Sequence, residues 1–338
     1  MTYMTYPKVS IIIPVRQINQ NLKEHLPKYQ ELDYPDFEVL IHVDQKKPEP
    51  SEQWPKVKII YQPGVSAPPQ KRNTLAKEAR GKILAFIDDD AYPDPNWLTE
   101  AGRWFSEEKV AAVGGPNITH PQDNLWQRVG GLVWGSWLGS GGSGLNRVEK
   151  MGKYKGREIN DWASVNLLVR KSDFEELGGF INQYYPGEDT KLCLDINQKL
   201  NKKIMYEPEA VVYHHRRAIF IPHLKQVGAY GRHRGRFAKI FPQTSRKIGY
   251  FLPSLFVLGL CLGPIAGVVF PPLMFAYLLC VTAYCCLLIY SGYQVYKKSR
   301  RLAEALLVIP AIFATHLWYG IMFIKGLLTP EYEGLGNY

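Results

Sequence analysis

Residues 83–98 read ILAFIDDDAYPDPNWL. Residues 83–87 form a short apolar run that is partly β-branched, which predicts a buried strand. Three carboxylates, Asp88, Asp89 and Asp90, follow the run without a break. Adjacent carboxylates repel one another, and a bound proton or cation relieves that repulsion. This stretch therefore predicts a strand that ends at an acidic ligand-binding site.

Apolar runs and helical patterns alternate on both sides of this strand. Further strands are predicted at residues 9–14, 37–44, 57–61 and 110–113, and helices at 19–31, 71–79 and 96–107. This spacing predicts an α/β domain with a mostly parallel central sheet and helices on both of its faces. Ligands bind such sheets at the carboxyl ends of the strands, where Asp44 and the three aspartates lie.

The composition describes a basic chain with enough apolar residues for a core. The chain has 338 residues, of which 46% are apolar, and a formal net charge of +10. The positive charge predicts an anionic partner, and nucleic acid is not expected because no nucleic-acid reader motif is present. Four of the five cysteines lie in long apolar stretches, so a disulfide framework is not expected. The N-terminus lacks the apolar core of a signal peptide.

Three long apolar spans follow residue 248, at roughly 250–270, 272–293 and 302–324. Each is long enough to cross ~30 Å of hydrocarbon as a helix. The basic stretch KKSRR (297–301) separates the last two spans, and the positive-inside rule then predicts a multi-pass protein of the inner membrane with a cytoplasmic N-terminal domain. Two alternatives are a hairpin formed by the first two spans and three buried helices of a soluble protein.

The segment directly before the spans is basic and contains apolar residues at near-helical spacing. It predicts an amphipathic helix on an anionic membrane surface, and a solvated basic helix is the alternative. The apolar positions are Phe220, Ile221, Leu224, Val227 and Tyr230. The expected organisation is therefore a catalytic domain at 1–215, an interfacial segment at 216–248, membrane helices at 249–326 and a tail at 327–338.

Several stretches together resemble family 2 inverting glycosyltransferases, which have the GT-A fold. They are VSIIIPV, KRNTLAKEARGKILAFIDDD, GGPN, NLLVRKSDFEELGGF, PGEDTKLCLDI, YEPEAVVYHHRR and QVGAYGRHRGR. The resemblance is greatest to the membrane-attached group that builds exopolysaccharide, O-antigen and other lipid-linked glycans, with the succinoglycan type nearest. It implies a nucleotide-diphosphate sugar donor.

The acidic strand end suits a hard divalent cation. Asp88 and Asp90 form an Asp-x-Asp pair, and carboxylate oxygens are the ligands that Mg²⁺ or Mn²⁺ prefers. Such an ion would neutralise charge on a leaving diphosphate, although acids at strand ends also serve as helix caps. The resemblance implies that Asp88 lies near the ribose and Asp90 on the metal. It also implies a histidine ligand after residues 210–213. Because successive strand residues face opposite ways, we expect one of His214 and His215, and favour His215. A histidine that only pairs with backbone or with a carboxylate is the alternative.

The resemblance further implies a nucleotide site at the ends of the first strands. One departure is the sequence Asp44-Gln45-Lys46-Lys47, where the family often has Asp-Asp-Gly-Ser, and it leaves the identity of the base open. For Arg72, one of the residues implied at this site, the alternative role is an ion pair with an acid of its own helix. The predicted donor contacts are Pro14, Val15, Asp44, Arg72, Asp88 and Asp89.

The pair Glu188–Asp189 resembles the catalytic Glu-Asp of the family. Asp189 is then the general base that deprotonates the acceptor hydroxyl, and Glu188 holds the acceptor or orients Asp189. The simpler interpretation is a pair of acids at a helix N-terminus. The segment GRHRGR replaces the Gln-x-x-Arg-Trp motif of processive synthases, so the chain is expected to add one sugar. In this segment Arg232, Arg234 and Arg236 are predicted to contact donor or lipid phosphate, or the lipid surface in general.

The glycine-rich residues 135–162 are predicted to form a mobile segment over the acceptor site. Trp134, Trp137 and Trp162 could stack on sugar rings or enter the membrane interface, and core packing is the alternative. The predicted function is transfer of one sugar to a hydroxyl of a polyprenyl-(di)phosphate-linked glycan in cell-surface polysaccharide assembly. Two alternatives are a polyprenyl-monophosphate sugar synthase and a non-catalytic membrane scaffold.

Overall fold

The computed structural model describes residues 7–45, 54–141, 144 and 156–330. Within these ranges the chain forms two compact units, of which unit 1 comprises residues 7–120 and 156–215, and unit 2 comprises residues 121–141, 144 and 216–330. The chain passes between the units after residue 120 and after residue 215, so residues 121–141 and 144, which lie within the domain expected at 1–215, belong to unit 2. Most of the predicted tail, Lys46, Lys47 and the middle of the glycine-rich segment lie outside the described residues.

Unit 1 is built on an eight-stranded sheet of order β3-β2-β1-β4-β9-β6-β10-β8. Four of the seven neighbouring strand pairs are parallel, which confirms the predicted α/β class with its mostly parallel sheet. Antiparallel pairing occurs on both sides of β9 and between β8 and β10. The strands are β1 (Val9–Pro14), β2 (Phe37–Val43), β3 (Val57–Tyr61), β4 (Ile83–Phe86), β6 (Val110–Gly114), β8 (Arg157–Ile159), β9 (Leu167–Arg170) and β10 (Lys203–Tyr206).

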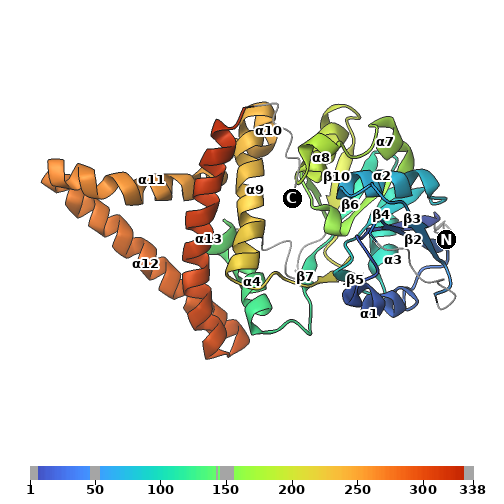
Figure 1. Cartoon of the computed structure of the whole chain (residues 1–338), viewed down its shortest axis with the longest axis horizontal. Coiled ribbons are helices and arrows are strands. Elements are labelled where there is room, and N and C mark those ends of the chain that lie inside the picture. The colour runs from blue at the N-terminus through green and yellow to red at the C-terminus, as the bar shows by residue number, and fades with distance from the viewer. Residues whose placement is uncertain (1–6, 46–53, 142–143, 145–155, 331–338) are drawn as a thin grey trace. The chain divides into compact units, whose positions relative to one another are not determined.

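Helices cover both faces of this sheet because successive strand residues point to opposite sides (Figure 1). Ile11 and Ile13 pack with α1 (Gln20–Tyr29) and α3 (Trp97–Gly102) in one hydrophobic cluster. Ile12 belongs to a second cluster on the other face, with α2, α7 and α8. These three helices span Pro68–Glu78, Lys171–Glu176 and Glu188–Gln198, and short 3₁₀ turns occupy Arg103–Ser106, Ser164–Asn166 and Asn182–Tyr184.

A small second sheet of order β5-β11-β7 completes unit 1. Its strands are β5 (Ala91–Pro93), β7 (Asn117–Thr119) and β11 (Val212–His214). Because β5 begins directly after Asp90, the three aspartates lie in the connection between the two sheets. Of these strands the sequence indicates only β11, because the apolar run 210–213 leads into it. Strands β5 and β7 have three residues each and no such run, so their pattern is too short to recognise.

Gly115, directly after β6, permits a close backbone contact that no other residue allows. A Cβ atom there would lie 1.9 Å from the carbonyl oxygen of Ala210. We expect Gly115→Ala to lower the free energy of unfolding by about 1–3 kcal/mol, the usual cost of overpacking. The matched control is Gly102→Ala, whose Cβ would meet nothing closer than a Tyr34 ring carbon at 3.5 Å. Thermal melts of both variants test this, and equal melting temperatures would contradict it.

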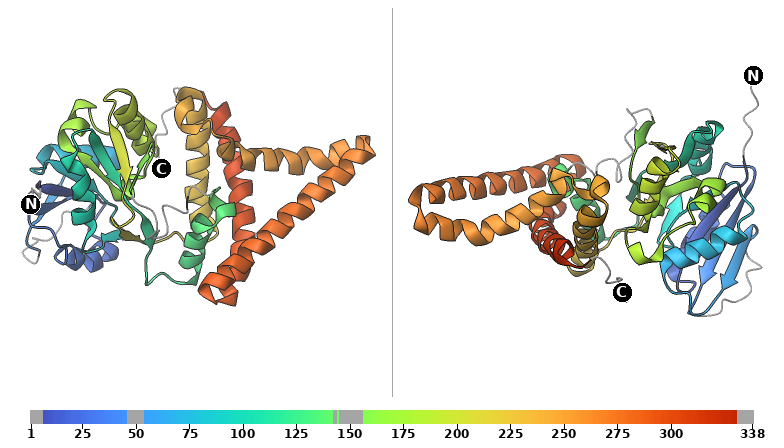
Figure 2. Two further views of the ribbon diagram at one scale, coloured as in Figure 1. Left: turned by 180° about the vertical axis from the view of Figure 1, so that it is seen from behind. Right: turned by 90° about the horizontal axis from the view of Figure 1, so that it is seen from above.

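Unit 2 is helical, and its helix α9 (Ile221–Ile240) lies alongside α13 (Leu302–Leu328) in all three views (Figures 1 and 2). A stripe of Gly228, Gly231 and Gly235 allows this close approach, since a Cβ at Gly235 would lie 2.0 Å from the carbonyl oxygen of Phe323. The apolar positions predicted to form one face of α9 do not share one environment, because Val227 is buried whereas Ile221 is 82% exposed. Contact with α13 thus combines the glycine stripe with buried larger side chains, and His223 Nε2 lies 3.0 Å from Thr315 Oγ1 of α13.

Three helices of unit 2 are long and apolar enough to cross a membrane. They are α11 (Ile248–Val269), α12 (Pro271–Ser299) and α13, which correspond to the three predicted spans. Buried Glu304 at the start of α13 accepts a hydrogen bond from Arg128 Nε at 2.8 Å, which joins α13 to α4 (Leu125–Gly135). The remaining helices are α5 (Trp137–Ser140) and α10 (Pro242–Ser245).

Candidate active site

The acidic connection between β4 and β5 holds its three carboxylates in different environments. Asp90 is 6% exposed, and its carbonyl oxygen accepts a hydrogen bond from the His215 N–H at 3.0 Å. Asp89 accepts a hydrogen bond from the side chain of Asn19, the residue that also caps α1. Burial, followed by the charge of Asp90, raises the pKa of Asp89 to about 6, although Asn19 acts in the opposite direction. The acids therefore crowd one another, as the sequence predicts.

Asp88, Asp90 and His214 together could hold a metal ion. One donor atom from each lies within 4.8 Å of the others, and His214 Nε2 is 3.1 Å from Asp90 Oδ1. Two carboxylates and one imidazole suit Mn²⁺. Mg²⁺ prefers oxygen ligands, so it would be held mainly by the two carboxylates. His215, which we favoured as the ligand, does not join this group; it lies against His120, with ring centroids 3.7 Å apart. The two histidines face opposite ways as expected, but the one beside the aspartates is His214.

Arg72 connects the acidic turn to the second acidic motif. This buried side chain on α2 donates from Nη2 to Asp88 at 2.7 Å and from Nη1 to Glu188 at 2.9 Å. Its guanidinium also lies 5.7 Å from the centre of the Phe180 ring. Because Arg72 and Glu188 are 116 residues apart, this contact brings the predicted donor and acceptor residues into one site.

The second motif lies at the N-terminus of α8, where Glu188 is buried and Asp189 is half-buried. The backbone N–H of Ser164 donates to Asp189 Oδ2 at 3.2 Å, and the N–H of Thr190 donates to Oδ1 at 2.7 Å. These bonds fix the carboxylate while leaving part of the residue accessible. A carboxylate held in this way can accept a proton from a bound hydroxyl group.

Three carboxylates surround the single guanidinium of Arg72. Burial, and next the charge of Asp189, raise the pKa of Glu188 to about 8, with Arg72 opposing the shift. Burial acts to lower the pKa of Arg72, but Asp88, Glu188 and Asp189 outweigh it and raise that pKa. The guanidinium therefore stays charged, and burial, which is greater at Glu188 than at Asp88 or Asp189, disfavours the charged form of Glu188 while the ion pair with Arg72 favours it.

A second buried basic side chain, Lys71, lies at the predicted nucleotide site. Lys71 on α2 donates to the carbonyl oxygen of Val15 at 2.7 Å and pairs with the carboxylate of Asp44. The side chains of Lys71 and Asp44 are only 2% and 6% exposed. Lys71 thus ties the ends of β1 and β2 together. Sequence reasoning overlooked it, although it stands next to Arg72 in the KRN stretch.

Replacing Arg72 with methionine is expected to destabilise unit 1. Loss of one partner from a buried ion pair costs about 3–5 kcal/mol, because the other charge remains buried. Asp88 would also lose its fixed position, so the affinity for nucleotide sugars should fall. The control is Arg80→Met at an exposed position just after α2. Thermal melts and nucleotide binding measure both effects, and an Arg72 variant that matches the control in both would refute this role.

The remaining predicted residues fall into different places. Pro14 and Val15 are buried at the end of β1, whereas the three arginines of GRHRGR lie on α9 in unit 2. Arg234 lies 4.9 Å from the centre of the Tyr250 ring. Trp162 is buried and donates to the carbonyl oxygen of Gly115 at 3.0 Å, so it packs in the core. The other tryptophans and arginines named from the sequence are Trp134, Trp137, Arg232 and Arg236, of which Trp137 is 60% exposed.

Comparison with known proteins adds a family match. The model of glycosyl transferase family 2 matches residues 10–178, which is half of the chain. Glycosyltransferase AglE of Haloferax volcanii is 27% identical over 214 residues, covering 58% of this chain and 64% of that protein. The pre-mycofactocin glycosyltransferase of Mycobacterium tuberculosis is 23% identical over 226 residues, covering 63% of this chain and 45% of its own length. The chain thus spans only part of these relatives.

Solved structures show the same fold. The mannosyltransferase PcManGT from Pyrobaculum calidifontis, in complex with GDP-Man and Mn²⁺, has a TM-score of 0.55 at 18% identity and covers 93% of this chain and 88% of its own. GalNAc-T7 with UDP, GalNAc and Mn²⁺ has a TM-score of 0.51 at 15% identity, covering 72% and 52%. At these identities the likeness concerns the fold, which is the GT-A fold predicted from the sequence.

Proposed function

The chain belongs to glycosyltransferase family 2, and on this premise we propose that it is a membrane-bound inverting enzyme that transfers one sugar from a nucleotide-diphosphate sugar to a hydroxyl of a polyprenyl-linked glycan. The observation that carries the proposal is the bridge made by Arg72. It holds Asp88, on the donor side, and Glu188, beside the acceptor-side base, within one hydrogen-bonded group.

The donor is proposed to bind at the carboxyl ends of β1, β2 and β4. Asp44, fixed by Lys71, is suited to contact the base, and Asp88 to contact the ribose. Pro14, Val15 and Asp89 belong to the same edge of the sheet. Asp88, Asp90 and His214 would hold Mn²⁺ or Mg²⁺, which when bound neutralises charge on the leaving diphosphate.

The acceptor side is proposed to work by general base catalysis. Asp189 takes the proton of the attacking hydroxyl, and its two backbone hydrogen bonds keep the carboxylate oriented for that transfer. Inversion requires one in-line displacement, so one base opposite the leaving group is sufficient. Glu188 acts through Arg72 and Asp189 as a positioning residue, because it is buried among them.

A lipid-carried acceptor is supported by the composition of unit 2. Three helices are long and apolar enough to anchor the protein in a membrane, and a basic helix precedes them. We propose an inner-membrane protein with a cytoplasmic catalytic unit. On α9, Arg232, Arg234 and Arg236 are proposed to contact lipid phosphate, since guanidinium groups pair with phosphate in two-point geometry.

A panel of sugar nucleotides tests this function in purified protein. Each donor is added with Mn²⁺, with Mg²⁺ or with a chelator, and the melting temperature is recorded. We expect one donor to raise the melting temperature only when metal is present, because only a ligand that binds the folded state stabilises it. The same donor should then be consumed when a polyprenyl-linked acceptor is supplied. Absence of metal-dependent stabilisation by every donor would refute the proposal.

A further inference from the structure

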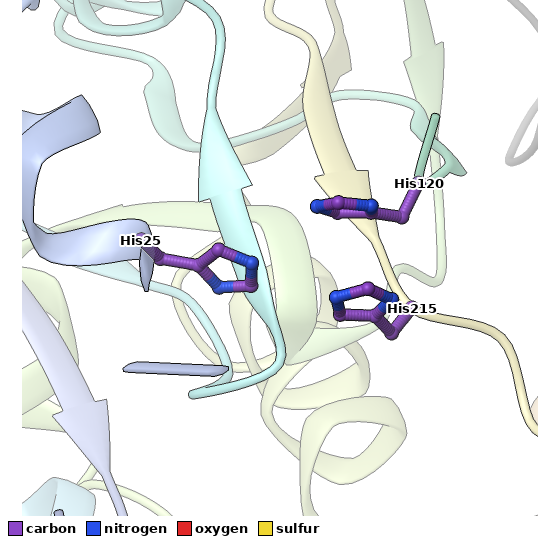
Figure 3. A group of neighbouring side chains, drawn as sticks. All are labelled: His25, His120 and His215. Carbon is purple, nitrogen blue, oxygen red and sulfur yellow. The ribbon is translucent and has the colours of Figure 1, made fainter. Parts of the chain in front are cut away.

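Three histidines come together in unit 1 outside the site described above. They are His25 on α1, His120 directly after β7, and His215 directly after β11. One ring nitrogen from each lies within 4.8 Å of the others. Figure 3 shows the rings of His120 and His215 one over the other, with the ring of His25 reaching toward them from its helix.

His25 occupies an unusual position for a polar side chain. It is 3% exposed and lies on the core-facing side of α1, between the apolar residues Leu22 and Leu26. Among the residues that the structure describes, neither of its ring nitrogens has a hydrogen bond partner. An unpaired buried nitrogen costs free energy, and a bound ligand would offset that cost.

From this geometry we propose that His25, His120 and His215 bind a divalent transition-metal ion that prefers imidazole nitrogen, such as Zn²⁺. Imidazole is the ligand type that separates Zn²⁺ from the hard cations expected at the aspartates. Nitrogen ligands lie about 2.0–2.1 Å from zinc, which places two tetrahedral ligands about 3.3 Å apart. The three nitrogens lie within 4.8 Å of one another, so they would have to draw closer, and the stacked rings of His120 and His215 would have to turn so that both nitrogens point at one ion.

The surroundings favour a neutral ring at His25. Burial, followed by the neighbouring His120 and His215, lowers the pKa of His25 to about 4, so its ring is neutral at physiological pH. Neutral imidazole is the form that binds metal. Tyr92 packs against His25 and His120 with ring centroids 5.2 Å away in each case, which supports both rings. His215 is half-buried, so it is the most accessible of the three rings.

The location suggests what the ion would do. The chain leaves unit 1 immediately after His120 and again after His215. Two of the three proposed ligands are therefore the last residues of unit 1 before the chain enters unit 2. A bound ion would tie both passages to α1. It would also fix the end of β11, where His214 contacts Asp90 at 3.1 Å. We assign the ion a structural role, independent of the proposed sugar transfer.

The test is zinc binding to the full-length protein in detergent, in the presence of excess Mg²⁺ to occupy carboxylate sites. We expect about one Zn²⁺ per chain by elemental analysis, both in the wild type and in Asp90→Asn, which removes the acidic site. His25→Phe should weaken zinc binding by about a hundredfold or more, while filling the apolar stripe of α1. His42→Phe is the matched control, because His42 is a buried histidine of β2 outside the cluster.

Spectroscopy on the wild type keeps the test independent of variant folding. X-ray absorption of the zinc-loaded protein should show three imidazole ligands, and cobalt substitution should give the visible bands of four-coordinate Co²⁺. The half-buried His215→Asn is a second variant expected to lose the ion. Zinc that disappears in Asp90→Asn, remains in a folded His25→Phe, or is bound by oxygen ligands overturns the proposal. So does a wild type that binds no zinc, which would leave the rings as an aromatic stack.

Discussion

Asp90→Asn is expected to lower the rate of sugar transfer by about a thousandfold or more, which corresponds to about 4 kcal/mol of transition-state stabilisation. Asparagine keeps the size of the side chain but removes the charge that would hold a divalent ion beside the diphosphate. Asp90 is buried and its carboxylate contacts His214, so water cannot readily take the place of the lost carboxylate. Chelation of divalent ions should reduce the wild-type rate to a similar extent, and added Mn²⁺ should restore it.

The control for this variant is Asp94→Asn. Asp94 lies four residues further along the chain, directly after β5, and accepts a local hydrogen bond from the Asn96 N–H at 3.1 Å. It should retain wild-type activity. Initial rates with the donor identified from the sugar nucleotide panel measure the effect. Transfer that persists in both Asp90→Asn and the chelated wild type would show that metal has no part in the reaction.

Asp189→Asn is expected to reduce kcat by a factor of about 10²–10⁴, the usual contribution of a general base. The amide oxygen can accept one of the two backbone hydrogen bonds, but the NH₂ group cannot accept the other, and the amide cannot take the proton of the acceptor. Binding of the nucleotide sugar should change little, because Asp189 is not among the predicted donor contacts. Separate measurements of donor affinity and kcat distinguish the two effects.

The same variant decides between two kinds of acceptor. A hydroxyl acceptor needs a base, whereas a polyprenyl phosphate is already anionic and needs less help. Substantial activity in Asp189→Asn would therefore contradict the proposed acceptor and favour a polyprenyl-monophosphate sugar synthase. Glu176→Gln, at an exposed position of α7, is the matched control and should behave as the wild type.

Local patterns were enough to predict most of the architecture of unit 1. The apolar runs at residues 9–14 and 57–61 coincide with β1 and β3, and the run at 83–87 exceeds β4 by one residue. Strands of this kind can be recognised because burial on both faces requires continuous apolar sequence. The strands missed are three or four residues long, such as β5 and β7, and their pairing depends on distant partners.

The site was predicted in its parts but not in its connections. The sequence indicated Asp88, Asp90, Arg72 and Glu188 as separate candidates, while their hydrogen bonds follow from how α2, β4 and α8 pack together. The direction of a side chain at a strand end depends on register. Pairing of β11 with β5 places His214 opposite Ala91, and its ring contacts Asp90. The sequence of the two adjacent histidines alone therefore could not show which of them lies beside the aspartates.

The amino-acid sequence by itself determined the class of fold, the acidic strand end and the three long apolar spans, because each depends on residues that are neighbours in the chain. Only the tertiary structure decided which acids share Arg72, that Gly228, Gly231 and Gly235 seat α9 on α13, and that three histidines from separate elements meet. Those contacts arise from strand order, register and helix packing, and each of these joins residues that are far apart in the sequence.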